Sequence, residues 1–287
     1  MEQQEGRDDE LLSIQEGLLE FENHFNQVLK ENDGNSHPPY ENNKEKEIAF
    51  AISLKSKTAS RDWKVVQNNL SKTLKSILRN TDQHFRIIVA GHKKPTIKEL
   101  DHEKITWITV KFAPPKGPNE YTRDKMRKRR AIISHLRNDN FKGYFMPLDS
   151  DDWIHHRFVE YIRSQPLSEA LILEQGFFSN IRNNEVWIMK NFYRRCGSSA
   201  LVYIDSNTNR KRYSVTVKAH PFIKENLKKI GLPYKLVKIP LVFRYFGHSD
   251  NNSILKGKLD TDFSALDCNA TGEILEDWIY NYFKVID

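Results

Sequence analysis

The chain of 287 residues carries a formal net charge of +7, spread unevenly as about −9 over residues 1–47 and about +16 over the remainder. This basic body favours an anionic partner, such as a nucleotide diphosphate, a phospholipid surface or nucleic acid. The composition excludes a membrane-spanning protein, which needs about 20 consecutive apolar residues, and a disulfide-rich secreted one, because there are only two cysteines; we expect a cytoplasmic location, with peripheral contact at the inner face of a membrane left open.

Residues 9–31 have apolar side chains at helical spacing and predict an N-terminal amphipathic helix. The polar face of this helix is acidic, so we expect it to dock on the body of the protein, or on a second copy in a homo-oligomer, in preference to a membrane. Residues 31–47 are polar and contain Pro-Pro and Asp-Gly pairs, which are typical of a linker. We therefore divide the chain into residues 1–46, a helix and linker, and residues 47–287, one large domain.

The large domain alternates short apolar strands with amphipathic helices. Nearly continuous apolar strands joined by helices predict an α/β fold with a central, mostly parallel sheet flanked by helices. The pattern also predicts a helix that closes the chain. The expected strands cover residues 48–54, 85–91, 105–110, 143–148, 170–178, 199–204 and 240–248, and the expected helices cover 62–80, 123–138, 155–164, 220–231 and 271–285.

Three carboxylates follow the fourth predicted strand within four residues, at Asp149, Asp151 and Asp152. Ligands of an open parallel sheet bind beyond the carboxyl ends of its strands, so this cluster falls on the expected functional edge. Crowded carboxylates repel one another unless a cation or hydrogen-bond donors compensate them. They are suitable oxygen ligands for Mg²⁺ or Mn²⁺, with substrate phosphates completing the coordination shell. The alternative is that one of these side chains only caps the following helix.

Several segments resemble family-2-type glycosyltransferases with the GT-A fold. The stretch FMPLDSDDWIHHRFVEYI is similar to their D-x-D segment, and RDKMRKRR is similar to the D-K-x-x-K-R segment of one bacterial subgroup. IAFAISLKS, TLKSILRNTDQHFRIIVAGHKKP, CGSSALVYI and IPLVFRYFGHSDNNS resemble further segments, so the similarity covers roughly residues 47–253. It implies a GT-A-like sheet and a metal-dependent hexosyltransferase-type enzyme, with Mn²⁺ or Mg²⁺ as cofactor. This enzyme would transfer a sugar, with inversion, from a nucleotide diphosphate, with UDP expected, to a glycan or lipid-linked acceptor in surface polysaccharide synthesis.

The resemblance also implies roles for individual residues. Asp151 is expected to be the direct metal ligand, and Asp149 to bind the ribose, or the metal through water. Asp152 is expected to contact the donor sugar or to support the loop, and His248 to be a further metal ligand or a diphosphate contact. The other residues expected to bind the nucleotide sugar are Lys55, Ser56, Asp124, Lys125 and Arg129, with Lys128 an alternative to Arg129.

An inverting transfer needs a general base near the acceptor hydroxyl. Many enzymes of the resembled group have a Glu-Asp pair ahead of a late helix, where this chain reads VKAHPFIKEN. His220 is therefore the expected base, with Glu174 as a second catalytic candidate and Asp205 as a further competitor. The CGSS segment is expected to lie near the acceptor, where Gly197 permits a close backbone approach.

Two other functions stay open at this point. A nucleotidyltransferase can use a similar fold and a carboxylate–metal site, but it usually needs a glycine-rich loop after the first strand, and SLKSKTASRDW contains no glycine. A non-enzymatic basic module would bind nucleic acid in a salt-sensitive manner and would keep that binding when Asp151 is replaced by Asn. The basic helix at 123–138 has no interleaved aromatic residues for base stacking around its charges, so we expect no nucleic-acid partner.

Overall fold

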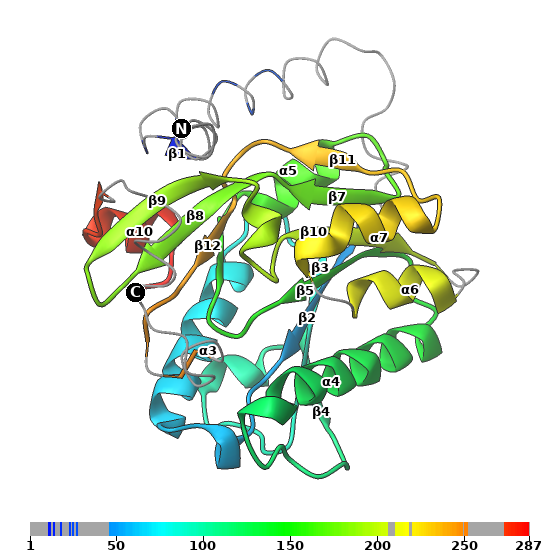
Figure 1. Ribbon diagram of the computed structural model, residues 1–287, viewed down its shortest axis with the longest axis vertical. Coiled ribbons are helices and arrows are strands. Elements are labelled where there is room, and N and C mark those ends of the chain that lie inside the picture. The colour runs from blue at the N-terminus through cyan, green and yellow to red at the C-terminus, as the bar shows by residue number, and fades with distance from the viewer. Residues whose placement is uncertain are drawn as a thin grey trace, which may run out of the picture.

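The computed structural model describes most of the chain, and its centre is a seven-stranded sheet (Figure 1). Neighbouring strands are parallel except for the two pairs made by one antiparallel strand. The predicted α/β class with a mostly parallel central sheet is therefore confirmed. The strands, in spatial order, are β11 (Lys235–Val237), β7 (Ala170–Leu173), the antiparallel β10 (Ala200–Ile204), β5 (Gly143–Leu148), β2 (Ile48–Ser53), β3 (Phe85–Gly91) and β4 (Ile105–Thr109). The described residues are 11–12, 14, 18, 23, 25, 27, 46–205, 210–217, 220–248, 250–251 and 273–286.

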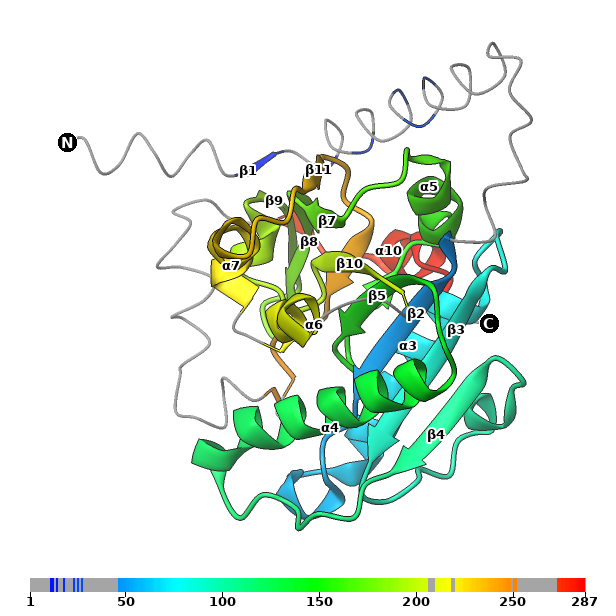
Figure 2. The same cartoon turned by 90° about the vertical axis from the view of Figure 1, so that its right-hand side faces the viewer.

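Helices cover both faces of the central sheet (Figure 2). Successive side chains of a strand point to opposite faces, so Phe50 and Ile52 of β2 join one core and Ala49 and Ala51 join the other. Burial on both faces explains why the strand is apolar throughout. The first core is covered by α3 (Trp63–Leu78) and α5 (Phe158–Ser164), and the second by α4 (Pro118–Asn138), α6 (Arg210–Thr216) and α7 (Ile223–Lys229).

A second, smaller sheet has an aromatic core. Trp153 stacks on Phe243 with ring centroids 4.6 Å apart, and Phe177 and Phe283 belong to the same cluster. Its strands, in spatial order, are β1 (Leu11–Leu12), β9 (Glu185–Lys190), β8 (Gln175–Asn180), β12 (Val242–Arg244) and β6 (Trp153–Ile154), while β13 (Glu273–Ile274) pairs with β9 beside β1 and precedes α10 (Asp277–Tyr282). Short 3₁₀ helices are η2 (Lys57–Ala59), η3 (Lys98–Asp101), η4 (Phe192–Arg194) and η5 (His220–Phe222).

Several later elements differ from the sequence prediction. Residues 170–178, predicted as one strand, are divided between β7 and β8 of different sheets. Glu174 lies at the division, and its N–H donates to the Val237 carbonyl while its own carbonyl accepts from the Phe192 N–H. The strand predicted at 240–248 is limited to β12, which ends three residues before Gly247, where φ is +97°. The closing helix is limited to α10, because β13 pairs with β9.

The described part of the N-terminal segment docks on the body of the same chain. Leu11 and Leu12, predicted in the helix, instead form β1, whose pairing partners are Met189 and Ile188 of β9. Phe25 is 1% exposed and joins the main core, 6.1 Å from the Tyr161 ring between centroids. The rest of the predicted helix and most of the linker lie outside the described residues, and association with a second copy stays a prediction.

The parallel pairing of β2 with β5 determines where the polar segments meet. Ile52 lies opposite Leu148, so the loops that follow these two strands open at the same edge of the sheet. Lys55 and Ser56 follow one strand, and the acidic triplet follows the other. Among the helices in the described ranges, none combines the length and the apolar character that crossing a bilayer requires.

Candidate active site

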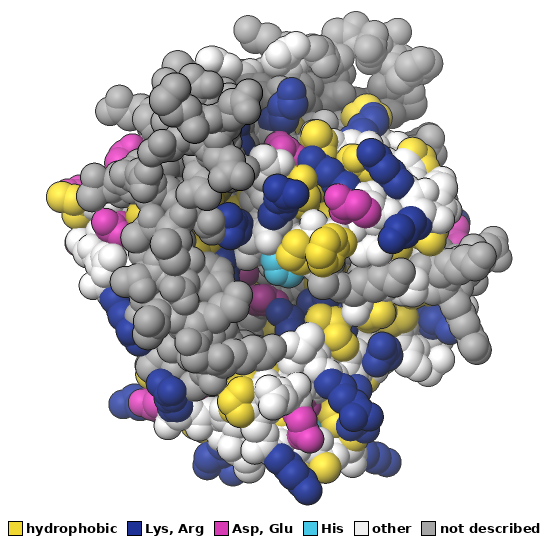
Figure 3. Space-filling view, viewed as in Figure 1, with side chains coloured by type: hydrophobic (Ala, Val, Ile, Leu, Met, Phe, Trp, Pro, Cys, Tyr) yellow, Lys and Arg dark blue, Asp and Glu magenta, His cyan; other side chains and the backbone are white. Residues whose placement is uncertain are grey.

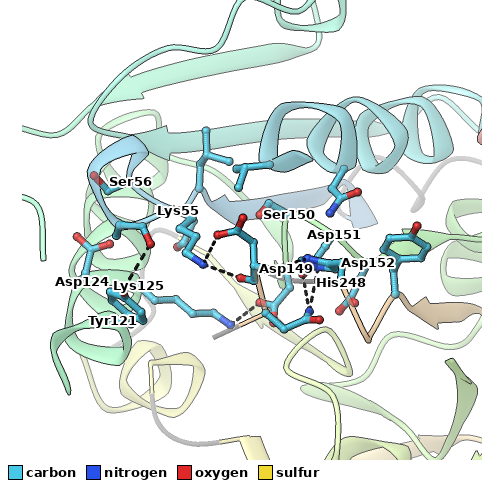
Figure 4. A pocket seen from close by; sticks show the side chains of 18 of the residues that line it. Lys55, Ser56, Tyr121, Asp124, Lys125, Asp149, Ser150, Asp151, Asp152 and His248 are labelled. Atoms are coloured by element: carbon cyan, nitrogen blue, oxygen red, sulfur yellow. Dashed lines mark hydrogen bonds and ion pairs between the residues drawn. The ribbon is translucent and has the colours of Figure 1, made fainter. Parts of the chain in front are cut away.

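A pocket opens at the carboxyl edge of the central sheet, where several parts of the chain meet. Seen from the side of Figure 1, acidic and basic side chains and a histidine gather in a hollow near the centre of the molecule (Figure 3). Most of its lining comes from the segment after β2, the start of α4, the acidic triplet and the segment after β12 (Figure 4), and Val66 and Asn69 of α3 and Pro115 also contribute. The residues expected from the sequence that line it are Lys55, Ser56, Asp124, Lys125, Asp149, Asp151, Asp152 and His248.

The acidic triplet forms a compact cluster. Asp149, Asp151 and Asp152 each offer a carboxylate oxygen, and these oxygens lie within 4.8 Å of one another. The Asp152 N–H donates to the Asp149 carbonyl at 3.3 Å, which gives a tight turn directly after β5. The next helix, α5, begins only at Phe158, and its N-cap residue is Arg157. The alternative in which the triplet caps that helix is therefore excluded.

Asp151 is held by the segment that follows β12. Its Oδ2 lies 2.8 Å from His248 Nε2 and 3.3 Å from Asn251 Nδ2. The Asp250 N–H donates to His248 Nδ1 at 3.3 Å, so a neutral imidazole carries its proton on Nε2 and donates it to Asp151. The ring of Tyr245 stacks on His248 with 5.8 Å between centroids. These contacts fix the orientation of the imidazole toward the cluster.

Asp149 is paired with a lysine from α4. Lys125 Nζ lies 2.5 Å from Asp149 Oδ1, and the Asp149 N–H donates to Ser198 Oγ at 2.9 Å. A Cβ added to Gly197 would lie 3.3 Å from Asp149 Oδ2, so this backbone passes close to the acidic cluster, while its approach to an acceptor stays a prediction. Desolvation acts to raise the pKa of Asp149, but Lys125, with smaller contributions from Arg129 and His220, outweighs it and holds the pKa below its usual value. This carboxylate is therefore ionised.

Asp152 is the buried member of the cluster, with 3% exposure. Its Oδ2 accepts hydrogen bonds from Ser198 Oγ at 2.5 Å and from Cys196 Sγ at 3.2 Å. Burial, together with the charges of Asp151 and Asp149, raises the pKa of Asp152 to about 8. Burial also raises the pKa of the Cys196 thiol, which leaves it protonated and a poor nucleophile. Asp152 thus ties the loop after η4 to the acidic turn.

The donor set of the triplet fits a divalent cation. Carboxylate oxygens are the ligands that hard cations prefer, and a cation bound at the cluster would oppose the burial and the charges of Asp151 and Asp149 that raise the pKa of Asp152. His248 Nε2 donates to Asp151 Oδ2 at 2.8 Å, so in this arrangement it orients that carboxylate, and its role as a further metal ligand stays a prediction. Asp149 and Asp151 are the more accessible carboxylates, so they are the first candidates to hold the ion.

Lys55 is fixed by a carboxylate that is almost two hundred positions away in the chain. Its Nζ donates to the Asp250 carbonyl at 2.6 Å and to Asp250 Oδ1 at 3.0 Å. Asp250 also accepts from the backbone N–H groups of Arg61 and Asp62, at 2.9 and 3.0 Å. Burial favours the neutral acid, but these hydrogen bonds and Lys55 outweigh it and keep the pKa of Asp250 below its usual value. Desolvation lowers the pKa of Lys55 despite this pairing.

The start of α4 contains a buried ion pair beneath the pocket. Lys128, which is fully buried, donates to Asp124 Oδ2 at 2.5 Å and to the Leu54 carbonyl at 2.8 Å. Its ammonium is thus directed to the end of β2 and does not line the pocket. Arg129 does not line it either, because this buried side chain donates to the Thr216 carbonyl at 2.7 Å. This hydrogen bond directs Arg129 to Thr216, so the contacts of Arg129 give no support to its predicted role as a phosphate ligand.

The three candidate bases lie in different surroundings. His220 Nδ1 donates to the Tyr193 carbonyl at 2.8 Å, which leaves Nε2 as the acceptor of the ring. Burial lowers the pKa of His220, and the opposing effects of the Tyr193 carbonyl and Asp149 do not restore it. Glu174 is paired with Lys224 at 3.0 Å, and Asp205 lines a separate pocket beside α6. Of these three, His220 alone combines an acceptor ring nitrogen with the electrostatic influence of the acidic cluster.

Sequence reasoning missed several residues of the site. Asp250, Tyr121, Arg244 and Tyr245 line the pocket, and Ser198 bonds both Asp149 and Asp152. Asp250 lies two positions after His248 in the run SDNNS, so the polar loop that follows an apolar strand could have indicated it as a site residue. The others carry no local signal, because their roles depend on contacts between distant parts of the chain.

Comparisons with known proteins add little to this description. No protein-family model matches the chain, and no curated protein matches it. Among solved structures, the fold is similar to a candidate nucleotide-diphospho-sugar transferase from Desulfovibrio desulfuricans G20, with a TM-score of 0.38 and 8% sequence identity. This similarity covers 67% of the present chain and 80% of the other. A likeness this distant supports no conclusion about function. Any conclusion about function therefore has to be based on the geometry of the pocket.

Proposed function

We propose that this protein is a divalent-cation-dependent glycosyltransferase that takes a sugar from a nucleotide diphosphate, with UDP the expected nucleotide. One observation carries the proposal: the compact acidic triplet shares a pocket with Lys55 and Lys125 at the carboxyl edge of a mostly parallel sheet. The resemblance of the D-x-D and D-K-x-x-K-R segments supports the same activity. The acceptor would be a glycan or a lipid-linked saccharide, and the product would enter a surface polysaccharide.

The two ends of the pocket suit the two ends of such a donor. In Figure 4, Ser56, Tyr121 and Asp124 lie at one end, and Asp152 and His248 lie at the other. We assign the nucleoside to the first end and the transferred sugar to the second. The diphosphate would then lie between them, within reach of Lys55 and Lys125.

The acidic triplet would serve departure of the diphosphate. Mn²⁺ or Mg²⁺ held by Asp149 and Asp151 would neutralise the negative charge that develops on this leaving group. Lys125 already pairs with Asp149, so its ammonium is positioned to donate to a phosphate oxygen beside the ion. Asp152 would keep the acidic turn in place through Ser198 and Cys196.

His220 would activate the acceptor hydroxyl. Burial keeps the imidazole neutral at pH 7, and the bond from Nδ1 to the Tyr193 carbonyl leaves the Nε2 lone pair as the proton acceptor. Glu174 is the weaker candidate, because its carboxylate is engaged by Lys224. Attack by the deprotonated hydroxyl on the face of the sugar opposite the diphosphate would invert the anomeric carbon.

The experiment that tests this function is thermal unfolding with nucleotides and Mn²⁺. A ligand at 100 times its dissociation constant stabilises the folded state by about 2.7 kcal/mol, which raises Tm by several degrees for a domain of this size. We expect UDP with Mn²⁺ to produce such a rise and UDP with EDTA to produce little of it. The Asp151→Asn variant should lose the Mn²⁺-dependent part and, with it, on the order of 10³-fold in transfer rate.

Asp101→Asn is the matched control, because Asp101 is 79% exposed and lies in η3, away from the pocket. This variant should respond to UDP and Mn²⁺ as the wild type does. A wild type that is stabilised by no nucleotide, but binds nucleic acid in a salt-sensitive manner that Asp151→Asn leaves intact, would establish the basic binding module instead. Stabilisation confined to nucleoside triphosphates would favour a nucleotidyltransferase.

A further inference from the structure

A second hollow lies against the helices η4 and η5. Its two 3₁₀ helices are joined by the hydrogen bond from His220 Nδ1 to the Tyr193 carbonyl, and the first turn of α7 completes its wall. We call it the η4–η5 pocket. It is lined by Asn191, Arg194, Arg195, Pro221, Phe222 and Glu225.

His220 connects this hollow with the proposed donor pocket. Phe222, two positions along η5 from His220, lines the η4–η5 pocket. The charges of Lys125 and Asp149, which line the donor pocket, act on the imidazole of His220. The candidate base is therefore next in sequence to the wall of the η4–η5 pocket and within electrostatic range of two residues that line the donor pocket.

The loop after η4 makes the same connection independently. Arg194 ends η4 and lines the η4–η5 pocket, and Gly197, three positions later, lies beside the donor pocket, where an added Cβ would meet the Asp149 carboxylate at 3.3 Å. The next residue, Ser198, donates to Asp152. A molecule seated against η4 is thus only a few residues of chain away from the acidic cluster.

The lining of the η4–η5 pocket is basic and presents one aromatic ring. It holds two guanidinium groups, from Arg194 and Arg195, against the single carboxylate of Glu225. The Arg194 side chain is exposed, and Phe222 is 61% exposed, the second-largest exposed fraction among the described large hydrophobic residues. Guanidinium groups bind carboxylates and phosphates with paired hydrogen bonds, and an exposed ring offers an apolar face to a sugar.

We propose that the η4–η5 pocket is the acceptor subsite and that it takes a saccharide carrying an anionic group, a carboxylate or a phosphate, bound by Arg194. This inference rests on the proposed glycosyltransferase function, because it assumes that His220 is the general base for an acceptor hydroxyl. The saccharide would lie over Phe222 with its anionic group toward Arg194. Its reacting hydroxyl would then be directed to Nε2 of His220.

Calorimetric titration with defined saccharides tests this subsite. Trigalacturonic acid and its methyl ester share one sugar backbone and differ in charge, and glucose 6-phosphate separates a phosphate from a carboxylate requirement. We expect the wild type to bind the acid, the phosphate or both roughly tenfold more tightly than the ester, as charge-assisted hydrogen bonds predict. Arg194→Gln should reduce that preference to about twofold or less.

The matched control is Lys98→Gln, which removes one positive charge from an exposed position of η3 and should keep the full preference. Phe222→Ser should weaken binding of acid and ester alike. Equal affinity of the wild type for the charged and neutral saccharides, or a preference unchanged in Arg194→Gln, would overturn the assignment. Absence of any response to UDP and Mn²⁺ would count against the proposed function alone, because the saccharide titration measures binding without turnover.

Discussion

The chain up to the acidic turn at residue 152 and the chain after it, which we call the first and second halves, contribute to the pocket in different ways. The first half supplies Lys55, Lys125 and the acidic triplet, from loops that follow parallel strands and from the helix α4. The second half supplies their partners: Ser198 binds Asp152 and the Asp149 N–H, and Asp250 binds Lys55. The residues that would meet the donor are thus placed by the sheet, and their orientation is set by side chains from the second half.

This division has a physical reason. Parallel strands bring their carboxyl ends to one edge whatever side chains follow them. The charged residues of the first half therefore meet at that edge because of the backbone arrangement alone. Charges near a sheet edge stay in place only when partners compensate their desolvation. His248 for Asp151 and Asp250 for Lys55 provide that compensation, across 97 and 195 positions of sequence.

Among replacements in the second half of the chain, we expect His220→Asn to lower the transfer rate most. The Asn amide can keep the donor to the Tyr193 carbonyl, but it offers no basic nitrogen, so the transfer rate should fall by about 10²- to 10⁴-fold. Because burial lowers the pKa of His220, the wild-type kcat/KM should stay constant down to below pH 6.5 and fall only as the imidazole becomes protonated. The variant should lose this acidic limb. A pH–rate profile measures both effects.

Glu174→Gln serves as the control for that measurement. Its carboxylate is paired with Lys224 and lies outside the residues that line the donor pocket, so the acidic limb should be retained. If Glu174→Gln removes the limb while His220→Asn keeps it, the base is Glu174 and the proposed role of His220 is wrong.

Asp250→Asn tests whether the second half of the chain positions Lys55, and we expect an effect of intermediate size. Asp250 compensates Lys55 and two backbone N–H groups, and its side chain is fully buried. An amide leaves a largely buried ammonium without its counter-charge, which should reduce the free energy of unfolding by about 2 kcal/mol. The KM for the donor should rise by about tenfold as Lys55 loses its orientation. Urea denaturation and donor titration provide the two values.

The exposed Asp101→Asn variant again gives the comparison, because an isolated surface pair contributes about 0–1 kcal/mol. If Asp250→Asn unfolds at the same urea concentration as Asp101→Asn, then Lys55 does not depend on the second half of the chain for its position, and the division between the two halves fails.

The same division separates what the sequence could predict from what it could not. The strands at 85–91 and 143–148 have the predicted bounds, because each is an apolar run with a polar residue at either side. The run 170–178 is apolar over most of its length as well, yet it belongs to two sheets, since pairing partners and not hydrophobicity decide where a strand ends. Periodicity cannot report partners that lie far away in the chain.

The site shows this limit residue by residue. Asp149, Asp151 and Asp152 are recognisable by their local crowding, and Lys55 by its place after a buried strand. Asp250 could be recognised as a turn residue, but nothing near it indicates that it binds Lys55. The acidic cluster was therefore predictable from local sequence, whereas the network that orients it required the tertiary structure.

The smallest expected effect concerns Gly197, whose backbone lies beside the Asp149 carboxylate. The backbone there is outside the left-handed region, so an Ala side chain brings no backbone strain and should leave the free energy of unfolding unchanged or raise it by about 0.4–1 kcal/mol. Its Cβ would meet Asp149 Oδ2 at 3.3 Å, which moves the carboxylate by a few tenths of an ångström. Because a 1 Å misplacement costs about 10²-fold, Gly197→Ala should lower kcat/KM by about threefold. Unimpaired activity in this variant would mean that the acidic turn tolerates displacement by the loop after η4, and that the second half only surrounds the cluster without positioning it.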